Sequence, residues 1–163
     1  MIYQGTARYP VTEIILHCAD TRPEWMAGHP LAEKVAEIRR WHVQERGWRD
    51  IGYHWVINRD GAVAPGRGEI EIDAHVEGHN RGTIGICLLG GHGAKADDLF
   101  ERNFTPAQAA TVRRMIGDLA PNGDSNGFAS FIVGLGGISI AGLLIDLIRT
   151  RTSKAKGDGD AQG

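Results

Sequence analysis

Histidine and cysteine are the residue types in this chain best suited to metal chemistry. Seven histidines and two cysteines occur in 163 residues, and imidazole and thiolate are the groups that bind zinc in proteins. His17 ends the apolar run TEIILHC, and the carboxyl ends of strands in α/β sheets commonly present ligands. A single strand histidine also fits a structural, hydrogen-bonded role. His17 is therefore a candidate ligand that needs partners.

The other candidates give no ligand pattern by themselves. His92 follows two glycines just beyond the apolar run TIGICLL and could lie beside His17, although a solvated loop histidine is the simpler interpretation. Cys18 should face away from His17 because strand side chains alternate, and Cys87 should be a core residue. Two such cysteines predict no disulfide framework. The remaining histidines without ligand spacing are His29, His42 and His79, with His54 expected to be packed.

Composition limits the function classes. The formal net charge is −2 and the pI is near 6.4, so there is no basic footprint for nucleic acid. The first ten residues lack the charged and apolar regions of a signal peptide, so export would need another route.

Apolar patterning predicts a small mixed β-sheet with flanking helices, an α/β domain over residues 1–120. Thr12–Cys18 and Thr83–Leu89 are apolar on both faces, as in buried strands. Asp60-Gly61 separates two β-type runs and predicts a hairpin. Apolar positions spaced along residues 31–46 predict a helix. A second helix should start at Thr105-Pro106-Ala107-Gln108, which has the form of a capping box.

Four sequence segments together resemble a known family. In order, they are IILHCADTRP, IRRWHVQERGWRDIGYHWVINRDGAV, AHVEGHNRGTIGICLLGG and NFTPAQ. They resemble the type-two N-acetylmuramoyl-L-alanine amidases, the family of phage lysozyme-like endolysins and peptidoglycan recognition proteins, over about residues 11–119. The resemblance implies zinc-dependent hydrolysis of the amide between muramic acid and L-alanine in peptidoglycan.

The resemblance also implies roles for individual residues. His17 resembles the first zinc ligand of the family, and Tyr53 resembles the active-site tyrosine beside the metal. His75 resembles a residue that lines the pocket without binding zinc. Asn80 and Arg81 are weaker candidates for contacts to the glycopeptide. A tyrosine hydroxyl near bound water could orient it or stabilise an oxyanion.

The sequence departs from the family after the second predicted helix. Family members continue into a strand with a second histidine ligand, then a catalytic lysine and a third ligand, usually cysteine. Here no histidine follows His92 and no cysteine follows Cys87. Two of three family ligands and the lysine are therefore absent, the family domain is expected to be incomplete, and occupancy by zinc is doubtful. A substitute ligand is conceivable at His92, if its loop lies beside the His17 strand.

Residues 128–148 form a nearly uncharged apolar run, FASFIVGLGGISIAGLLIDLI. About 20 apolar residues suffice for a membrane-spanning helix. We therefore expect a linker at residues 121–127, a single membrane span at 128–148 that contacts lipid, and a disordered polar tail at 149–163. Basic residues after the span favour a cytoplasmic carboxyl terminus, whereas the missing signal peptide argues the other way, so orientation stays open.

Three hypotheses follow. The chain is a membrane-anchored peptidoglycan amidase with impaired activity, a non-catalytic peptidoglycan-binding or regulatory module, or a recombined product without a stable fold. The partner expected in the first two cases is peptidoglycan or a muropeptide.

Overall fold

A computed structural model describes residues 1–95 and 98–119 of the chain. The strands are β1 (Tyr3–Gln4), β2 (Tyr9–Pro10), β3 (Glu13–Cys18), β4 (Trp55–Ile57), β5 (Val63–Pro65) and β6 (Thr83–Leu88). The helices are α1 (Leu31–Arg40), the π-helical turn η1 (Trp41–Glu45), α2 (Phe100–Asn103) and α3 (Pro106–Leu119).

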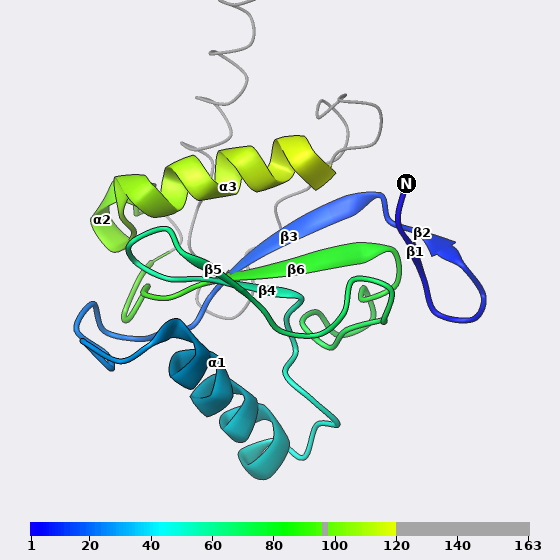
Figure 1. The fold of residues 1–163 in the computed structure, drawn as a ribbon, viewed down its shortest axis with the longest axis horizontal. Helices are drawn as coiled ribbons and strands as arrows, with labels where there is room; N and C mark the ends of the chain where they lie inside the picture. Colours follow the sequence, from blue (N-terminus) through cyan, green and yellow to red (C-terminus); the bar gives the residue numbers. More distant parts are fainter. Residues whose placement is uncertain (96–97, 120–163) are drawn as a thin grey trace, which may run out of the picture.

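The central sheet is mixed, with strand order β3-β6-β4-β5. Strand β6 runs parallel to both β3 and β4, and β5 returns antiparallel to β4. The short β1-β2 hairpin forms a second sheet at one end of the molecule (Figure 1). The central sheet confirms the predicted mixed α/β fold. The pair β4-β5 confirms the hairpin predicted at Asp60-Gly61.

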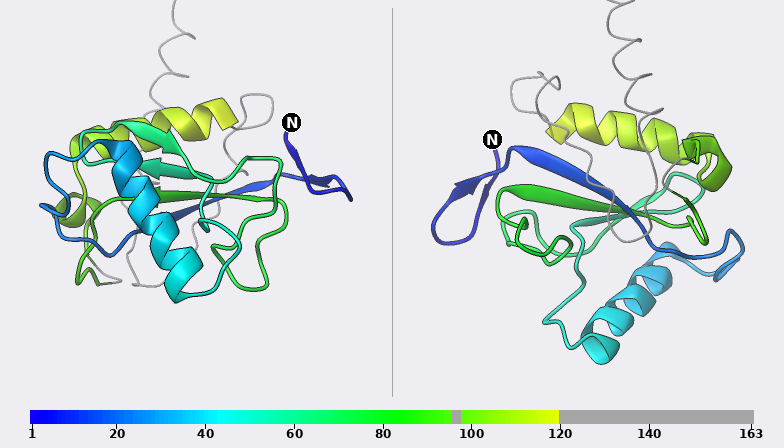
Figure 2. Two further views of the ribbon diagram at one scale, coloured as in Figure 1. Left: turned by 60° about the horizontal axis from the view of Figure 1, so that its bottom comes forward. Right: turned by 180° about the vertical axis from the view of Figure 1, so that it is seen from behind.

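Two helical layers cover opposite faces of the sheet. Figure 1 and the rear view in Figure 2 show α3 on one face and α1 on the other. Along β6, Ile84, Ile86 and Leu88 pack in the core that contains α3, while Cys87 packs in the core that contains α1. The alternation follows from the two-residue period of a strand. The carboxyl ends of β3 and β6 then meet at one edge, where His17 stands opposite Cys87.

The predicted helix over residues 31–46 is confirmed in part, because its second half has a different geometry. The α-helix ends at Arg40 and continues as the π-helical turn η1. A π-helical turn inserts an extra residue per turn and is frequent at functional sites. It brings both Trp41 and His42 to the lining of the same pocket.

The predicted membrane location is wrong. The longest described helix, α3, has 14 residues and is about 21 Å long at 1.5 Å per residue, short of the ~30 Å bilayer core. Across residues 1–95 and 98–119, no helix has the length and apolarity to cross a bilayer. The predicted linker, span and tail lie outside these residues, and the membrane and lipid predictions are withdrawn.

The capping box predicted for α3 is confirmed, and its glutamine also joins the helix to the sheet. Thr105 Oγ1 accepts a hydrogen bond from the Gln108 backbone N–H at 3.1 Å, and Gln108 Oε1 accepts one from the Thr105 N–H at 3.0 Å. The Gln108 Nε2 donates to the carbonyls of Leu89, at 2.8 Å, and Ile57, at 3.3 Å. Gln108 is fully buried, so it satisfies polar groups at the ends of β6 and β4 that water cannot reach.

We expect Gln108→Ala to lower the free energy of unfolding by about 2 kcal/mol, because it leaves the buried Leu89 carbonyl without its donor. Urea unfolding followed by circular dichroism measures this change. Gln44→Ala, at an exposed position in η1, is the matched control and should change stability by less than about 0.5 kcal/mol. Equal effects of the two substitutions would contradict the role assigned to Gln108.

Candidate functional site

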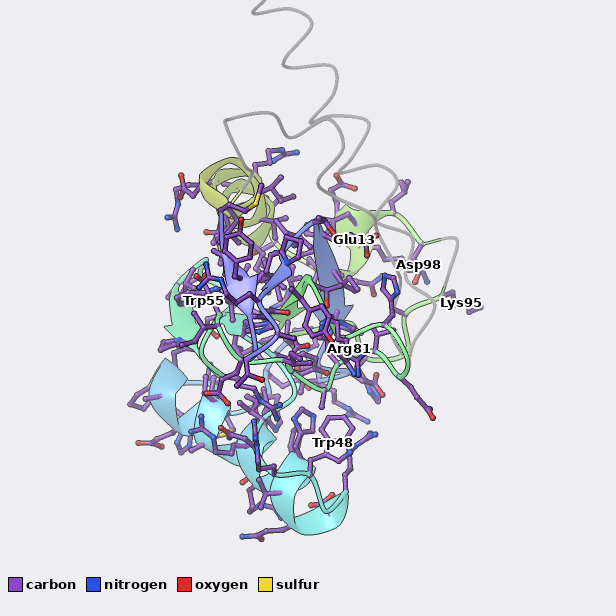
Figure 3. All side chains as sticks on the ribbon, turned by 90° about the vertical axis from the view of Figure 1, so that its right-hand side faces the viewer. Glu13, Trp48, Trp55, Arg81, Lys95 and Asp98 are labelled. Carbon is purple, nitrogen blue, oxygen red and sulfur yellow. The ribbon has the colours of Figure 1, made fainter. Side chains whose placement is uncertain are left out.

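A cleft of about 430 Å³ opens beside the carboxyl end of β3. Strand β3, the α1–η1 segment and the loops before β4 and β6 all contribute side chains to it. In Figure 3, Trp48 marks this region beside the end of the α1–η1 segment. The lining residues are His17, Cys18, Ala19, Asp20, Ile38, Trp41, His42, Glu45, Arg46, Trp48, Tyr53 and His75. Three residues predicted to be functional, His17, Tyr53 and His75, are thus brought together.

The imidazoles of His17 and His75 are joined by a direct hydrogen bond. The His17 Nε2 and His75 Nδ1 atoms are 2.6 Å apart, and the two rings meet edge to face. Burial, followed by the neighbouring His75, lowers the pKa of His17 to about 3. His17 is therefore a neutral imidazole at physiological pH, with one ring nitrogen already committed to His75.

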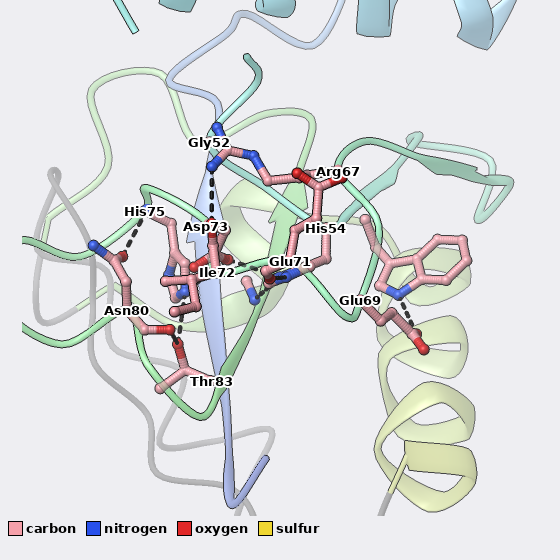
Figure 4. Close-up of polar contacts among 12 residues, drawn as sticks. Gly52, His54, Arg67, Glu69, Glu71, Ile72, Asp73, His75, Asn80 and Thr83 are labelled. Atoms are coloured by element: carbon pink, nitrogen blue, oxygen red, sulfur yellow. Dashed lines mark hydrogen bonds and ion pairs between the residues drawn. The ribbon is translucent and has the colours of Figure 1, made fainter. Parts of the chain in front are cut away.

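The Nε2 of His75 is hydrogen-bonded to Thr83 Oγ1 at 2.9 Å and lies beside a buried carboxylate, that of Asp73. Its Oδ2 lies 2.9 Å from His75 Nε2 and 2.7 Å from His54 Nδ1, and its side chain has no exposed surface. Neither carboxylate oxygen makes a well-aligned hydrogen bond, so the contact is chiefly electrostatic. Burial alone would raise the pKa of Asp73, but the adjacent imidazoles of His54 and His75 outweigh it and hold the pKa below its usual value. Figure 4 shows Asp73 between these two histidines.

The backbone around His75 is fixed by Asn80. The Asn80 Oδ1 accepts a hydrogen bond from the backbone N–H of His75 at 3.0 Å (Figure 4) and another from the backbone N–H of Val76 at 2.8 Å. Asn80 thus positions the loop and is not among the residues that line the cleft. Arg81 is also outside the lining, with its guanidinium over the ring of Tyr9 at 5.2 Å. Substrate contacts by Asn80 and Arg81 stay predictions, without support from this geometry.

Asp73 and His75 can pack against the sheet because residue 85 of β6 is a glycine. A Cβ atom on Gly85 would lie 2.8 Å from two ring carbons of His75 and 2.9 Å from Asp73 Oδ2. These distances are shorter than real Cβ contacts, so only glycine permits this packing on β6.

The Tyr53 ring lies between two histidine rings. Its ring centroid is 5.3 Å from that of His17 and 5.3 Å from that of His42. Burial, and then the nearby thiols of Cys87 and Cys18, raise the pKa of Tyr53 well above its usual value. Its hydroxyl therefore stays protonated and can act only as a neutral hydrogen-bond donor or acceptor.

His42 and Trp48 are site residues that the sequence analysis did not identify. The His42 Nδ1 accepts a hydrogen bond from the Gly52 N–H at 2.9 Å, and the His42 ring packs on Trp48 with centroids 4.6 Å apart. Burial, then the charges of Arg46 and Arg67, lower the pKa of His42 to about 4. The sequence does place His42 on the apolar face of a predicted helix, which could have identified it as a buried residue. The search for metal-ligand spacing did not use that position.

The structure does not bring the substitute ligand His92 to His17. His92 is exposed and faces Asp20 at 3.4 Å, outside the lining of the His17 cleft. Cys18 packs in the core on the α3 side, as predicted, although it also reaches the cleft wall. Cys87 is fully buried, and burial raises the pKa of both thiols.

The residues present do not fit the zinc site that the resemblance implies. Within the two described ranges, no three His, Cys, Asp or Glu side chains are placed to hold a metal ion, and the rest of the sequence contains no histidine or cysteine. Two nitrogens on one tetrahedral zinc, each at about 2.0–2.1 Å, would be roughly 3.3 Å apart. The 2.6 Å between His17 and His75 is instead a hydrogen-bond distance.

Comparisons with known proteins agree with the resemblance. The family of N-acetylmuramoyl-L-alanine amidases matches residues 7–134. The endolysin of Escherichia phage T7 is 44% identical over 113 residues, which is 69% of each chain. The endolysin of Klebsiella phage KP32 is 41% identical over 116 residues, 71% of each chain.

Solved structures share the fold at lower sequence identity. Drosophila peptidoglycan recognition protein SD has a TM-score of 0.65 at 13% identity, covering 90% of this chain and 83% of that one. Bumblebee peptidoglycan recognition protein SA has a TM-score of 0.61 at 21% identity, covering 88% and 84%. A structure of peptidoglycan recognition protein LE in complex with tracheal cytotoxin has a TM-score of 0.57 at 20% identity, covering 85% and 81%.

Gly85→Ala should displace His75 and Asp73 and lower the free energy of unfolding by about 1–3 kcal/mol, the usual cost of overpacking a core. Chemical denaturation measures the loss, and histidine NMR signals report the displaced rings. Gly117→Ala is the matched control, since nothing lies within 4 Å of a Cβ there. In the last turn of α3 it should be neutral or stabilising by up to about 1 kcal/mol. A stable Gly85→Ala variant with unchanged histidine signals would contradict this packing.

His42 should make stability depend on pH. The unfolded imidazole titrates near its ordinary pKa of 6.5, and the folded one near 4, so protonation favours the unfolded chain between these values. Stability is therefore lost as pH falls from about 6.5 to about 4. His42→Asn keeps an acceptor for the Gly52 N–H but cannot titrate, and its stability should fall less over this interval by about 1–3 kcal/mol.

The comparison of His42→Asn with the unmodified chain is made by urea unfolding at a series of pH values. The control is His29→Asn, at an exposed site on α1's amino-terminal side, which should reproduce the pH profile of the unmodified chain. Parallel profiles for all three proteins would show that His42 is not the titrating group.

Proposed function

The chain belongs to the N-acetylmuramoyl-L-alanine amidase family, and on that premise we propose that its His17 cleft binds peptidoglycan fragments while amide hydrolysis is impaired. The observation that carries this proposal is the bonded pair His17–His75, which occupies the place where the family resemblance implies a zinc ligand. The cleft remains, but its ligand set is incomplete.

The shape and lining of the cleft support binding. Its volume of about 430 Å³ lies within the range of about 300–1,000 Å³ typical of small-ligand sites. Aromatic rings of Trp41, Trp48 and Tyr53 supply apolar surface, and the imidazoles with Arg46 supply polar groups. The related recognition protein LE is described in complex with monomeric diaminopimelic acid-type peptidoglycan, so a ligand of this class suits the fold.

The protonation states support impaired hydrolysis. A general base works best when its pKa is near the working pH, whereas His17 has a pKa of about 3 and is a weak base. Tyr53 remains protonated, because its pKa is raised well above its usual value, so it cannot remove a proton from water. Without a zinc ion to acidify the attacking water, neither side chain activates water by itself at neutral pH.

Residual amidase activity is the second candidate function. His17 and Tyr53 occupy the positions that the resemblance implies for a zinc ligand and the active-site tyrosine, and their rings are adjacent, at 5.3 Å. This candidate requires zinc held by groups beyond the pair His17 and His75.

Calorimetric titration of the full chain with a muramyl tripeptide tests the proposal. We expect binding, and we expect His17→Ala to weaken it about tenfold, or by ~1.4 kcal/mol. His29→Ala, at an exposed histidine outside the cleft, should leave the affinity unchanged. Elemental analysis should find well under one zinc per chain, and purified cell-wall sacculi should release no stem peptide.

One zinc per chain, together with release of stem peptide that is lost in His17→Ala, would establish the amidase instead. No binding of the muramyl tripeptide and no hydrolysis would reject both functions for this cleft.

A further inference from the structure

A small depression of about 200 Å³ lies between the loop after β3, the start of α1 and the turn that joins β4 to β5. The charged and amide side chains in its lining are Arg22, Lys34, Asn58, Arg59 and Asp60. None of its lining residues belongs to the His17 cleft, so a ligand here is independent of the function proposed for that cleft. With three cationic side chains and one carboxylate, the depression has an excess of positive charge.

The buried side chain of Lys34 is the observation that points to a ligand. Lys34 has only 8% of its surface exposed, and lysine is almost never buried to this extent unless an opposite charge pairs with it. Its Nζ donates a hydrogen bond to the neutral Asn58 Oδ1 at 3.2 Å. Within residues 1–95 and 98–119, no carboxylate forms a salt bridge with it. An ammonium group has three donors, so its charge and two of its donors are left for a ligand.

Two arginines from other segments line the same depression. The Arg59 Nη1 donates a hydrogen bond to the Asn103 carbonyl at 3.1 Å. A Cβ atom on Gly90 would lie 2.7 Å from this nitrogen, so glycine leaves the space that the guanidinium needs. Arg22 is exposed, and its guanidinium makes no hydrogen bond or ion pair with the part of the chain that the structure describes. Since a guanidinium has five donors, both arginines keep donors for a ligand.

We propose that this depression binds a phosphate group, either as inorganic phosphate or as a small phosphomonoester. Ammonium and guanidinium groups form strong, charge-assisted hydrogen bonds to phosphate oxygens. A phosphomonoester carries a charge of about −1.5 to −2 at pH 7, which matches the excess of positive charge in the lining. The volume of about 200 Å³ is below the ~300–1,000 Å³ of sites for larger ligands, so the group attached to the phosphate must be small.

The carboxylate in the lining, that of Asp60, is compatible with an anion nearby. Asp60 Oδ1 accepts a hydrogen bond from the Ala62 N–H at 2.9 Å, the contact by which an aspartate stabilises its own turn. Asp60 is also exposed, so solvent and salt screen its charge. A metal cation would be repelled by three cationic neighbours, and a single carboxylate would leave much of their charge uncompensated.

Calorimetric titration of the full chain with sodium phosphate in a low-salt buffer tests the inference. We expect a Kd of about 1 mM or tighter and no binding signal from sodium chloride at matched ionic strength. Lys34→Met keeps the apolar stem but removes the ammonium group, and should weaken phosphate binding about tenfold or more. Arg22→Ala, at an exposed position, should weaken it about fivefold. Arg114→Ala removes an exposed arginine that lines a different pocket beside α3 and should leave the affinity unchanged.

Urea unfolding shows whether Lys34→Met acts on the site or on the fold. Without phosphate this variant should be at least as stable as the unmodified chain, because it removes a buried charge that has no charged partner. Phosphate should stabilise the unmodified chain, since it binds the folded state alone, and should stabilise Lys34→Met much less. Equal stabilisation of the two proteins by phosphate would overturn the site.

A parallel titration with glycerol 3-phosphate distinguishes the two forms of the ligand. Tighter binding of glycerol 3-phosphate than of phosphate, lost in Lys34→Met, would identify a phosphomonoester, and equal affinities would identify inorganic phosphate. No binding of either compound, or tighter binding of sodium acetate than of phosphate, would reject the phosphate site. The muramyl tripeptide titration of the His17 cleft is a separate measurement, so either proposal can fail without the other.

Discussion

The buried carboxylate of Asp73 is the constraint on which the site depends. A carboxylate without exposed surface must be compensated by close polar groups, because water cannot solvate it. His54 and His75 lie against it from opposite sides, at 2.7 Å and 2.9 Å, and Gly85 leaves the space that Asp73 and His75 need. The position of His75 then determines the partner of His17.

Gln4, near the amino terminus, belongs to the same buried polar cluster. Gln4 is fully buried, donates a hydrogen bond to the Thr83 carbonyl at 2.8 Å and accepts one from the Gly82 N–H at 3.0 Å. Its Nε2 also lies 3.4 Å from His54 Nε2. The β1-β2 hairpin thereby closes the end of the polar cluster away from the cleft, so residues more than 70 positions apart share one buried network.

Much of the fold could be predicted from local pattern. The strands that contain His17 and Cys87 are apolar runs. Asp-Gly is a typical hairpin turn, and β4 and β5 pair on either side of it. The capping box at Thr105 forms as expected. These features depend on neighbours in sequence, which the sequence shows directly. The resemblance likewise identified residues that do meet in one cleft.

What could not be predicted depends on contacts between distant segments. Asp73 stands in the polar stretch EIDAHVEG, which is typical of a solvated loop, and only its packing over Gly85 makes it buried. His42 lies where α-helical geometry gives way to the π-helical turn η1, and helical periodicity does not predict that change. The apolar run at residues 128–148 led to a membrane prediction that was wrong, since no helix across residues 1–95 and 98–119 has the length and apolarity to cross a bilayer; the run itself lies outside these residues.

The network around Asp73 also explains how the cleft can exist without a complete set of metal ligands. In many metal sites the ligands converge only when the ion is bound, so folding and binding are coupled. Here His17 is buried and needs a polar partner, and His75 supplies it at 2.6 Å. The two imidazoles satisfy each other, and the His75 Nε2 is hydrogen-bonded to Thr83 Oγ1 at 2.9 Å, so the site keeps its shape through its own hydrogen bonds. A zinc ion on the Nε2 of His17 would have to displace His75, whereas Nδ1 is not used by this hydrogen bond, so the shape of the cleft does not depend on a bound ion.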